Sequence, residues 1–99
     1  MMHIIAKRTL REHWKKPGRQ DSKEPLKAWY AIASKATWRH FADVRQQFGS
    51  ASAVGDRVVF NIKGNDYRLV VRINYEAQIG YVRFVGTHGE YDKLDVKNV

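Results

Sequence analysis

The chain has 99 residues, 43% of them hydrophobic, with 3 Trp, 5 Tyr and 4 Phe, which predicts one folded domain over residues 1–99 and excludes a disordered chain. Because it has no cysteine, a disulfide framework and a thiolate metal site are excluded, and no apolar run has the length of a membrane span. The formal net charge is +8, with 11 Lys/Arg against 4 Asp/Glu in residues 1–50, which suits nucleic acid, an acidic protein partner or an anionic membrane surface, unless it is only a solvated helical surface.

The start of the chain predicts an edge strand and a helix. Residues 2–6 are short and apolar, which is typical of an edge strand, and residues 7–16 place Leu10 and Trp14 on one face of a helix. Pro17-Gly18 is expected to end that helix. The opening MMHIIAKRT lacks the long apolar region of a signal peptide, so we expect a cytoplasmic protein.

Two further helices are expected before the strands begin. Asp21 and Ser22 are candidate N-caps for a helix that continues to about residue 37. Residues 41–48 keep the helical spacing of apolar side chains and predict a short helix, which a loop over residues 50–56 follows. The apolar face of the longer helix is expected to hold Leu26, Trp29, Tyr30, Ala33 and Thr37.

Three runs of β-branched and aromatic residues come next, at residues 57–62, 67–75 and 79–87. Gly64-Asn65-Asp66 joins the first two runs with residues that tolerate positive φ. The order of elements predicts an α+β fold. In this fold the N-terminal strand and two to three helices pack on one face of an antiparallel sheet that ends in a three-stranded meander.

Alternation along these strands predicts two faces with different chemistry. The face toward the helices is expected to hold Val58, Phe60, Ile62, Leu69, Val71, Ile73, Val82 and Phe84. The opposite face is expected to be open to solvent and to carry Val85 and a basic group, with no acidic residue inside the strands. That group consists of Lys63, Arg68, Arg72 and Arg83, with Asn61 on the same face.

A polar segment after the last strand adds groups that can transfer protons. The spacing of His88, Tyr91 and Asp92 allows one helical turn to gather all three. Taken alone, they are typical of a surface histidine, a core aromatic and a helix cap, but beside a basic face they favour a site. The 4 histidines of the chain show no metal-ligand spacing and no glycine-rich phosphate loop follows a strand, so we expect neither a metal nor a cofactor.

These residue types meet the needs of RNA cleavage without a metal. The 2′-hydroxyl of RNA attacks the adjacent phosphate, so the enzyme must accept its proton, stabilise the phosphorane-like transition state and protonate the leaving 5′-oxygen. Arginine forks match phosphate oxygens. A positioned side chain that transfers a proton typically contributes about 10²–10⁴-fold in rate.

Two motifs in the chain resemble a known family. FNIKGNDYRLV (residues 60–70) and GTHGEYDKLD (residues 86–95) closely resemble the HigB-type toxins of type II toxin–antitoxin systems, within the RelE-like mRNA interferase group. WRHFADVRQQF (residues 38–48) gives weaker support, and the resemblance extends over nearly the whole chain. It implies a RelE-like fold, cleavage of mRNA in the ribosomal A site, and neutralisation by a HigA-like helix-turn-helix antitoxin.

The resemblance also implies which side chains act. It places basic residues of the central strands at Lys63 and Arg68, the arginine of the last strand at Arg83, and the TH-x-EYD segment at His88, Tyr91 and Asp92. We therefore expect a catalytic set and an RNA-binding set, without assigning the general base or the general acid. The catalytic set is Arg68, Arg83, His88, Tyr91 and Asp92, and the RNA-binding set is Lys63, Arg72 and Asn61.

Two other functions remain open on the sequence. One is a non-catalytic RNA- or ribosome-binding module that uses the same basic face, and the other is a basic interaction domain with an acidic protein partner. The group formed by His88, Tyr91 and Asp92 favours the nuclease, because binding alone does not require it.

Overall fold

The computed structural model describes residues 1–99 and contains a five-stranded sheet with the strand order β1-β5-β4-β3-β2. β3 (Arg57–Ile62), β4 (Tyr67–Asn74) and β5 (Ile79–Thr87) are antiparallel neighbours. β1 (His3–Ile5) is the expected edge strand, but it runs parallel to β5, so the sheet is mixed rather than wholly antiparallel. The α+β class predicted from the order of elements is confirmed.

A short fifth strand, β2 (Ser52–Val54), pairs with β3 and lies inside the segment that was expected to be a loop. That expectation was wrong because the strand has only three residues and is mostly exposed, so it carries no apolar alternation to reveal it. Its tight connection to β3 uses Gly55 at φ +63. In the connection from β3 to β4, positive φ occurs at Lys63 and Gly64 rather than at Asn65 or Asp66.

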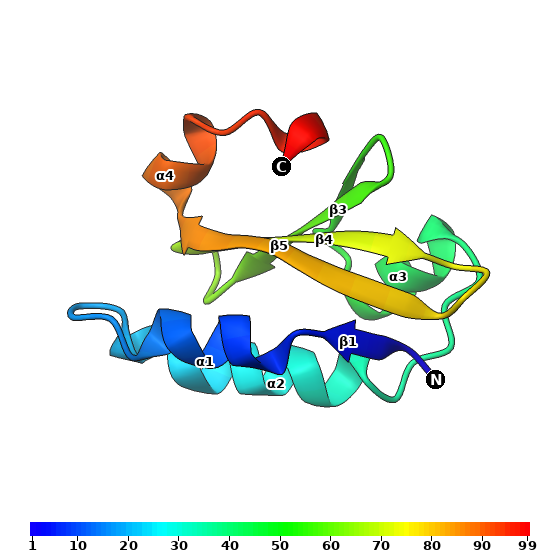
Figure 1. Cartoon of the computed structure of the whole chain (residues 1–99), viewed down its shortest axis with the longest axis horizontal. Coiled ribbons are helices and arrows are strands. Elements are labelled where there is room, and N and C mark those ends of the chain that lie inside the picture. The colour runs from blue at the N-terminus through cyan, green and yellow to red at the C-terminus, as the bar shows by residue number, and fades with distance from the viewer.

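Two helices, α1 (Lys7–Trp14) and α2 (Lys23–Ala33), cover one face of the sheet, and α3 (Phe41–Gln47) packs near its end (Figure 1). α3 matches the sequence prediction closely, whereas α2 ends four residues earlier than expected. The chain leaves the helix there to bury Trp38, whose indole N–H donates to the Gln47 side chain at 2.8 Å. None of the helices has the length and apolar character needed to cross a membrane.

The predicted caps of α2 have other roles. Ser22 precedes the helix, but its hydroxyl donates to the carbonyl of Arg19 at 2.8 Å and does not cap the helix. Asp21 lies in a 3-10 turn, η1 (Gln20–Ser22), and its carboxylate accepts a hydrogen bond from the Tyr67 hydroxyl. Both side chains therefore tie η1 to its surroundings instead of starting α2.

The main core fills the space between these helices and the sheet. Phe60, which is 1% exposed, lies at its centre, and its ring centroid is 5.2 Å from that of Trp29, 5.2 Å from that of Phe48 and 6.2 Å from that of Trp38. Each such aromatic pair contributes about 0.5–1.5 kcal/mol beyond the area it buries. Three segments that are far apart in the sequence are joined by this cluster.

A β-bulge in β5 changes which side chains face the core. Val71 pairs with Val82 and Val70 pairs with Phe84, so Arg83 is an extra residue without a partner in the ladder. As a result Val85 packs against the core, and Phe84 lies on the opposite face beside Val70. The sequence prediction had placed these two residues the other way round, because strict alternation cannot anticipate one extra residue.

The face opposite the helices is only partly open, contrary to expectation. Val59 and Val70 point to that face, yet they are only 4% and 0% exposed. The C-terminal segment, with α4 (His88–Asp92) and a final 3-10 turn η2 (Val96–Asn98), lies on this side of the sheet (Figure 1). The Arg57 guanidinium holds its end by donating to the Val99 carbonyl at 2.8 Å.

Candidate functional site

The side chain of Arg68 on β4 is the centre of the candidate site. Its guanidinium donates hydrogen bonds to the side-chain oxygens of Asn61, its cross-strand neighbour, and Asn65 in the preceding turn. The ring of Tyr91 lies next to it, with the guanidinium carbon 5.6 Å from the ring centroid. Neutral amides and an aromatic ring therefore orient Arg68, and no carboxylate neutralises it.

α4 carries the predicted proton-transfer residues to the same end of the sheet. The helix starts at a capping box, in which the Glu90 backbone N–H donates to the Thr87 hydroxyl at 3.1 Å and the Thr87 N–H donates to the Glu90 carboxylate at 2.8 Å. The hydrogen bond from the Thr87 N–H, supported by the nearby charge of Arg19, holds the pKa of Glu90 below its ordinary value. Glu90 therefore serves as a structural carboxylate.

The single turn of α4 gathers His88, Tyr91 and Asp92, as predicted. His88 Nε2 lies 3.4 Å from Asp92 Oδ1 across one turn, and both side chains are about half exposed. The backbone N–H of His88 donates to the Asp66 carbonyl at 3.1 Å, which fixes the start of α4 to the turn between β3 and β4. Arg68 and His88 therefore both contact the turn between β3 and β4, Arg68 through Asn65 and His88 through Asp66.

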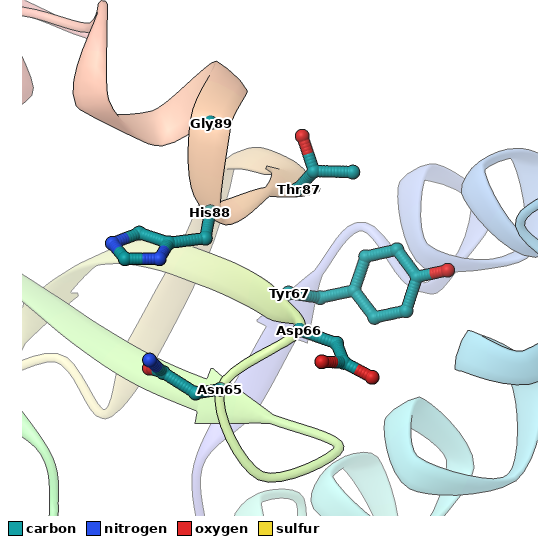
Figure 2. Close-up of a pocket in the computed structure, with 6 residues that line it drawn as sticks. All are labelled: Asn65, Asp66, Tyr67, Thr87, His88 and Gly89. Atoms are coloured by element: carbon teal, nitrogen blue, oxygen red, sulfur yellow. The ribbon is translucent and has the colours of Figure 1, made fainter.

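An open pocket of about 480 Å³ lies between that turn and the start of α4 (Figure 2). It is lined by Asn65, Asp66, Tyr67, Thr87, His88 and Gly89. In Figure 2 the side chains of Asn65 and His88 point to one side of the sheet, whereas Tyr67 points to the other, toward the helices. Arg68 lies on the side to which Asn65 and His88 point, because its guanidinium donates to the Asn65 side chain.

Two of the predicted basic residues are neutralised by carboxylates from the turns. Lys63 Nζ lies 3.0 Å from Asp21 and 3.2 Å from Asp66, and the hydrogen bonds to these carboxylates raise the pKa of Lys63, that of Asp21 first. Arg72 pairs with Asp56 at 3.0 Å. The strands contain no acidic residue, as predicted, but Lys63 does not lie on the face of Arg68 as expected. Its partner Asp21 belongs to η1 in the helical layer and also accepts from Tyr67, which points toward the helices, so Lys63 turns to that side of the sheet. Asp56 neutralises Arg72 on the face that Arg72 shares with Arg68.

Arg83 is the second guanidinium of this face that has no carboxylate partner. As the extra residue of the bulge it is exposed, and its guanidinium carbon lies 5.7 Å from the centroid of the Tyr81 ring. Tyr81 pairs with Arg72 across the ladder, so Arg83 lies on the face that also carries Arg68. The structure therefore brings Arg68, Tyr91, His88 and Asp92 together, with Arg83 further along the same face.

Sequence reasoning missed two residues at this site. Asn65 was regarded only as a turn residue, although it precedes Arg68 by three positions and lies in the resembling motif. Gly86 faces Arg68 across the ladder, and the Phe84 ring occupies the space where a side chain would lie: a Cβ added to Gly86 would be 2.5 Å from Phe84 Cζ. The bulge creates this contact, so alternation could not have revealed it.

Comparison with known proteins gives a consistent result. The sequence model of the HigB toxin family, described as the RelE-like toxic component of a toxin–antitoxin system, matches residues 22–94. Over 34 residues the chain is 50% identical to the mRNA interferase toxin HigB of Escherichia coli (strain K12) and to the mRNA interferases HigB of Escherichia coli O157:H7 and Shigella flexneri. This segment covers 34% of the chain and 33% of each relative, so it spans about a third of the length of these proteins.

Proposed function

The chain belongs to the HigB toxin family, the RelE-like toxic components of toxin–antitoxin systems, and from this premise we propose that it is an endoribonuclease that cleaves mRNA in the ribosomal A site and so arrests translation. The observation that supports this most directly is the Arg68 guanidinium. Asn61 and Asn65 orient it without neutralising it, and it lies beside the turn that carries His88, Tyr91 and Asp92.

The reaction proceeds through the substrate's own nucleophile. The 2′-oxygen forms a bond to phosphorus as it loses its proton to a base, and the bond from phosphorus to the 5′-oxygen breaks as an acid donates a proton to that oxygen. Arg68 and Arg83 stabilise the charge that grows on the phosphoryl oxygens, since guanidinium groups match these oxygens in geometry and keep their charge at every physiological pH. No resident metal or cofactor supplies a group to this scheme.

His88 and Tyr91 are the proton-transfer residues of the proposal. His88 Nε2 lies 3.4 Å from the Asp92 carboxylate, and in this proposal that nitrogen carries the ring proton, so that Nδ1 is the acceptor. Nδ1 of His88 is thus suited to accept a proton from the 2′-hydroxyl, and the Tyr91 hydroxyl, on the ring that lies beside Arg68, can donate to the leaving oxygen. Asp92 is the residue that positions His88.

The partners follow from the same assignment. Membership of this family implies an antitoxin that neutralises the toxin. We assign a HigA-like helix-turn-helix protein to that role and mRNA on the ribosome as the substrate. Arg72 and Asn61 form the RNA-contacting set on the face of Arg68 in this assignment, whereas Lys63 is held toward the helices by Asp21 and Asp66 and lies outside it.

A cleavage assay tests the proposal directly. On intact ribosomes, which themselves require Mg²⁺, the protein is expected to cut mRNA and leave a 2′,3′-cyclic phosphate or 3′-phosphate upstream and a 5′-hydroxyl downstream. Arg68→Ala should lower the rate by about 10²–10³-fold, the loss typical of removing one transition-state donor. Arg72→Ala is the matched control, because Arg72 lies on the same strand but is paired with Asp56, and it should weaken binding while cleavage persists.

Three results would contradict the proposal. Products with 5′-phosphate and 3′-hydroxyl ends would show that the 2′-hydroxyl is not the nucleophile. Cleavage of a substrate whose scissile 2′-hydroxyl is replaced by hydrogen would do the same. Tight RNA binding without any cutting by the folded protein would identify a non-catalytic RNA-binding module.

A further inference from the structure

We propose that the groove between α1 and α2 is a docking site for an acidic amphipathic helix of a partner protein. This interface is separate from the proposed nuclease function and does not depend on it. The groove has a volume of about 450 Å³. It is formed by the helices on the side of the sheet opposite α4 (Figure 1).

The shape of the groove follows from the spacing of the residues that line it. α1 contributes Lys7, Leu10, Arg11 and Trp14, and α2 contributes Lys23, Lys27, Tyr30, Ala31 and Ser34. Successive lining positions are one, three or four apart within each helix, so they form one broad stripe along the helix axis. The groove therefore runs parallel to both helices, as a site for a third helix requires.

The floor of the groove is apolar. Leu10 is buried at 1% exposure, while Trp14 and Tyr30 are half-buried and pack against the core with part of their surface facing the groove. An apolar floor bounded by polar residues is typical of a surface that buries anchor side chains of a partner. A helical ligand would place aliphatic side chains here at intervals of three and four residues.

The rim of the groove carries charge of one sign. Lys7, Arg11, Lys23 and Lys27 line it, and no carboxylate does. The nearest acidic residue of α1, Glu12, pairs with Arg8 at 2.6 Å and is not among the lining residues. The four cations have no carboxylate partner within the chain, so a ligand with flanking Glu or Asp complements the rim.

An acidic helix fits the groove better than RNA does. RNA-binding proteins stack bases on free aromatic faces, but Lys7 Nζ lies 4.9 Å from the Tyr30 ring centroid and occupies that face. Trp14 packs against the core. The rest of the apolar lining consists of Leu10, Trp14 and Ala31, which suits Leu or Ile side chains of a partner.

A synthetic peptide supplies the probe. A helix of about 14 residues, roughly four turns, with Leu at i, i+4 and i+7 and Glu at the flanking positions, is titrated into the full chain by calorimetry. The controls are a scrambled peptide of the same composition and a single-stranded RNA as competitor. NMR shift changes are expected at residues that line the groove and to be absent around Arg68.

The matched variants reverse the same number of charges. Lys23→Glu with Lys27→Glu should weaken peptide binding by at least about tenfold, because two rim cations become repulsive. Arg39→Glu with Lys97→Glu gives the same change of net charge outside the groove and should leave binding unchanged. Both pairs are exposed, so circular dichroism should show that the variants remain folded.

Three outcomes would overturn the inference. Equal binding of the scrambled peptide would show only general attraction to a basic protein. RNA that displaces the peptide from the groove would make this an RNA site, and failure of the amphipathic peptide to bind at millimolar concentration would remove the interface altogether. None of these results bears on the cleavage assay, because its decisive variants lie on the other side of the sheet.

Discussion

At the scale of single residues, the kind of group that orients a guanidinium decides whether its charge is available to bind a phosphate. Arg72 and Arg68 lie on the same strand and point to the same face, but Arg72 is paired with a carboxylate and Arg68 is bonded to amide oxygens. An amide fixes the direction of the guanidinium without cancelling its charge. Arg68 can therefore meet a phosphate without first breaking an ion pair.

The two candidate proton-transfer residues can be separated by substitution. Tyr91→Phe removes one hydroxyl but keeps the ring beside Arg68, so RNA affinity should change little. Loss of the acid should lower the single-turnover cleavage rate by about 10²–10⁴-fold.

His88→Gln is measured in the same assay, and a loss of similar size is expected because the side chain can no longer accept a proton. Asp92→Asn should have a smaller effect, since it leaves the imidazole in place and only weakens its orientation. Unchanged rates in both Tyr91→Phe and His88→Gln would move the proton transfers to other groups.

At the scale of secondary-structure elements, the position of α4 depends on the capping box formed by Thr87 and Glu90 and on the close packing at Gly86, just before the helix. A Cβ on Gly86 would be 2.5 Å from Phe84 Cζ and 2.8 Å from Glu90 Oε1. Glu90 closes the capping box at the start of α4. The close approach at Gly86 therefore links the position of the helix to the face that carries Arg68.

Gly86→Ala is expected to destabilise the protein by about 1–3 kcal/mol through this overpacking. In a domain of this size each kcal/mol lowers the melting temperature by about 4–8 °C. Gly89→Ala is the matched control, because a Cβ at Gly89 meets nothing within 4 Å and its φ is not positive. It should be neutral or slightly stabilising, and thermal unfolding of both variants, followed by circular dichroism, checks the contrast.

The elements also show how far sequence patterns extend. β3 and β5 begin and end where the runs of β-branched and aromatic residues predict, because residues that favour strands extend over both segments, although the bulge breaks the alternation within β5. β2 and the end of α2 were missed because pairing with β3 and burial of Trp38 determine them, and these are contacts with residues elsewhere in the chain. The sequence predicted which basic residues the strands carry, but not which of them are neutralised. That depends on Asp21, Asp56 and Asp66, which pair with Lys63 and Arg72 only in the folded chain.

At the scale of the whole molecule, a buried histidine connects the helical layer to the sheet. His13 is 3% exposed, its Nδ1 lies 3.0 Å from the Ser22 hydroxyl, and its ring meets the Tyr67 ring edge-on at 5.3 Å. Ser22 donates to Arg19, so His13 Nδ1 is the donor and Nε2 is left without a partner. Burial, reinforced by Lys16 and Arg19 and opposed by Glu90 and Asp21, lowers the pKa of His13.

This predicts a loss of stability in mild acid. The unfolded chain binds a proton at His13 near pH 6.5, whereas the folded protein resists it. The free energy of unfolding should therefore fall as the pH drops below about 6.5, by at most about 1.4 kcal/mol per pH unit for one group. The lowered pKa values of Glu90, Asp21 and Asp56 add their own loss only at lower pH, below about 4.5.

Denaturant melts between pH 7 and pH 5 on the wild type and on His13→Gln give the measurement. The variant, which cannot titrate at this position, should have the flatter profile even if its stability is lower throughout. Parallel profiles would show that His13 does not control the acid response.

The bulge at Arg83 implies an unusual tolerance to shortening. Removing a residue from the middle of a central strand normally turns every later side chain to the wrong face. Here deletion of Arg83 would leave Val82 inward, Phe84 outward and Val85 inward, so the strand would become regular and every later pair would keep its partner. A chain of 98 residues without Arg83 should thus fold. Deletion of Val82 also removes the bulge, but it places Arg83 opposite the buried Val71 on the core side and should be strongly destabilising. Because the sheet can form without Arg83, the side chain at this position can be selected for its effect on activity and not for its effect on folding.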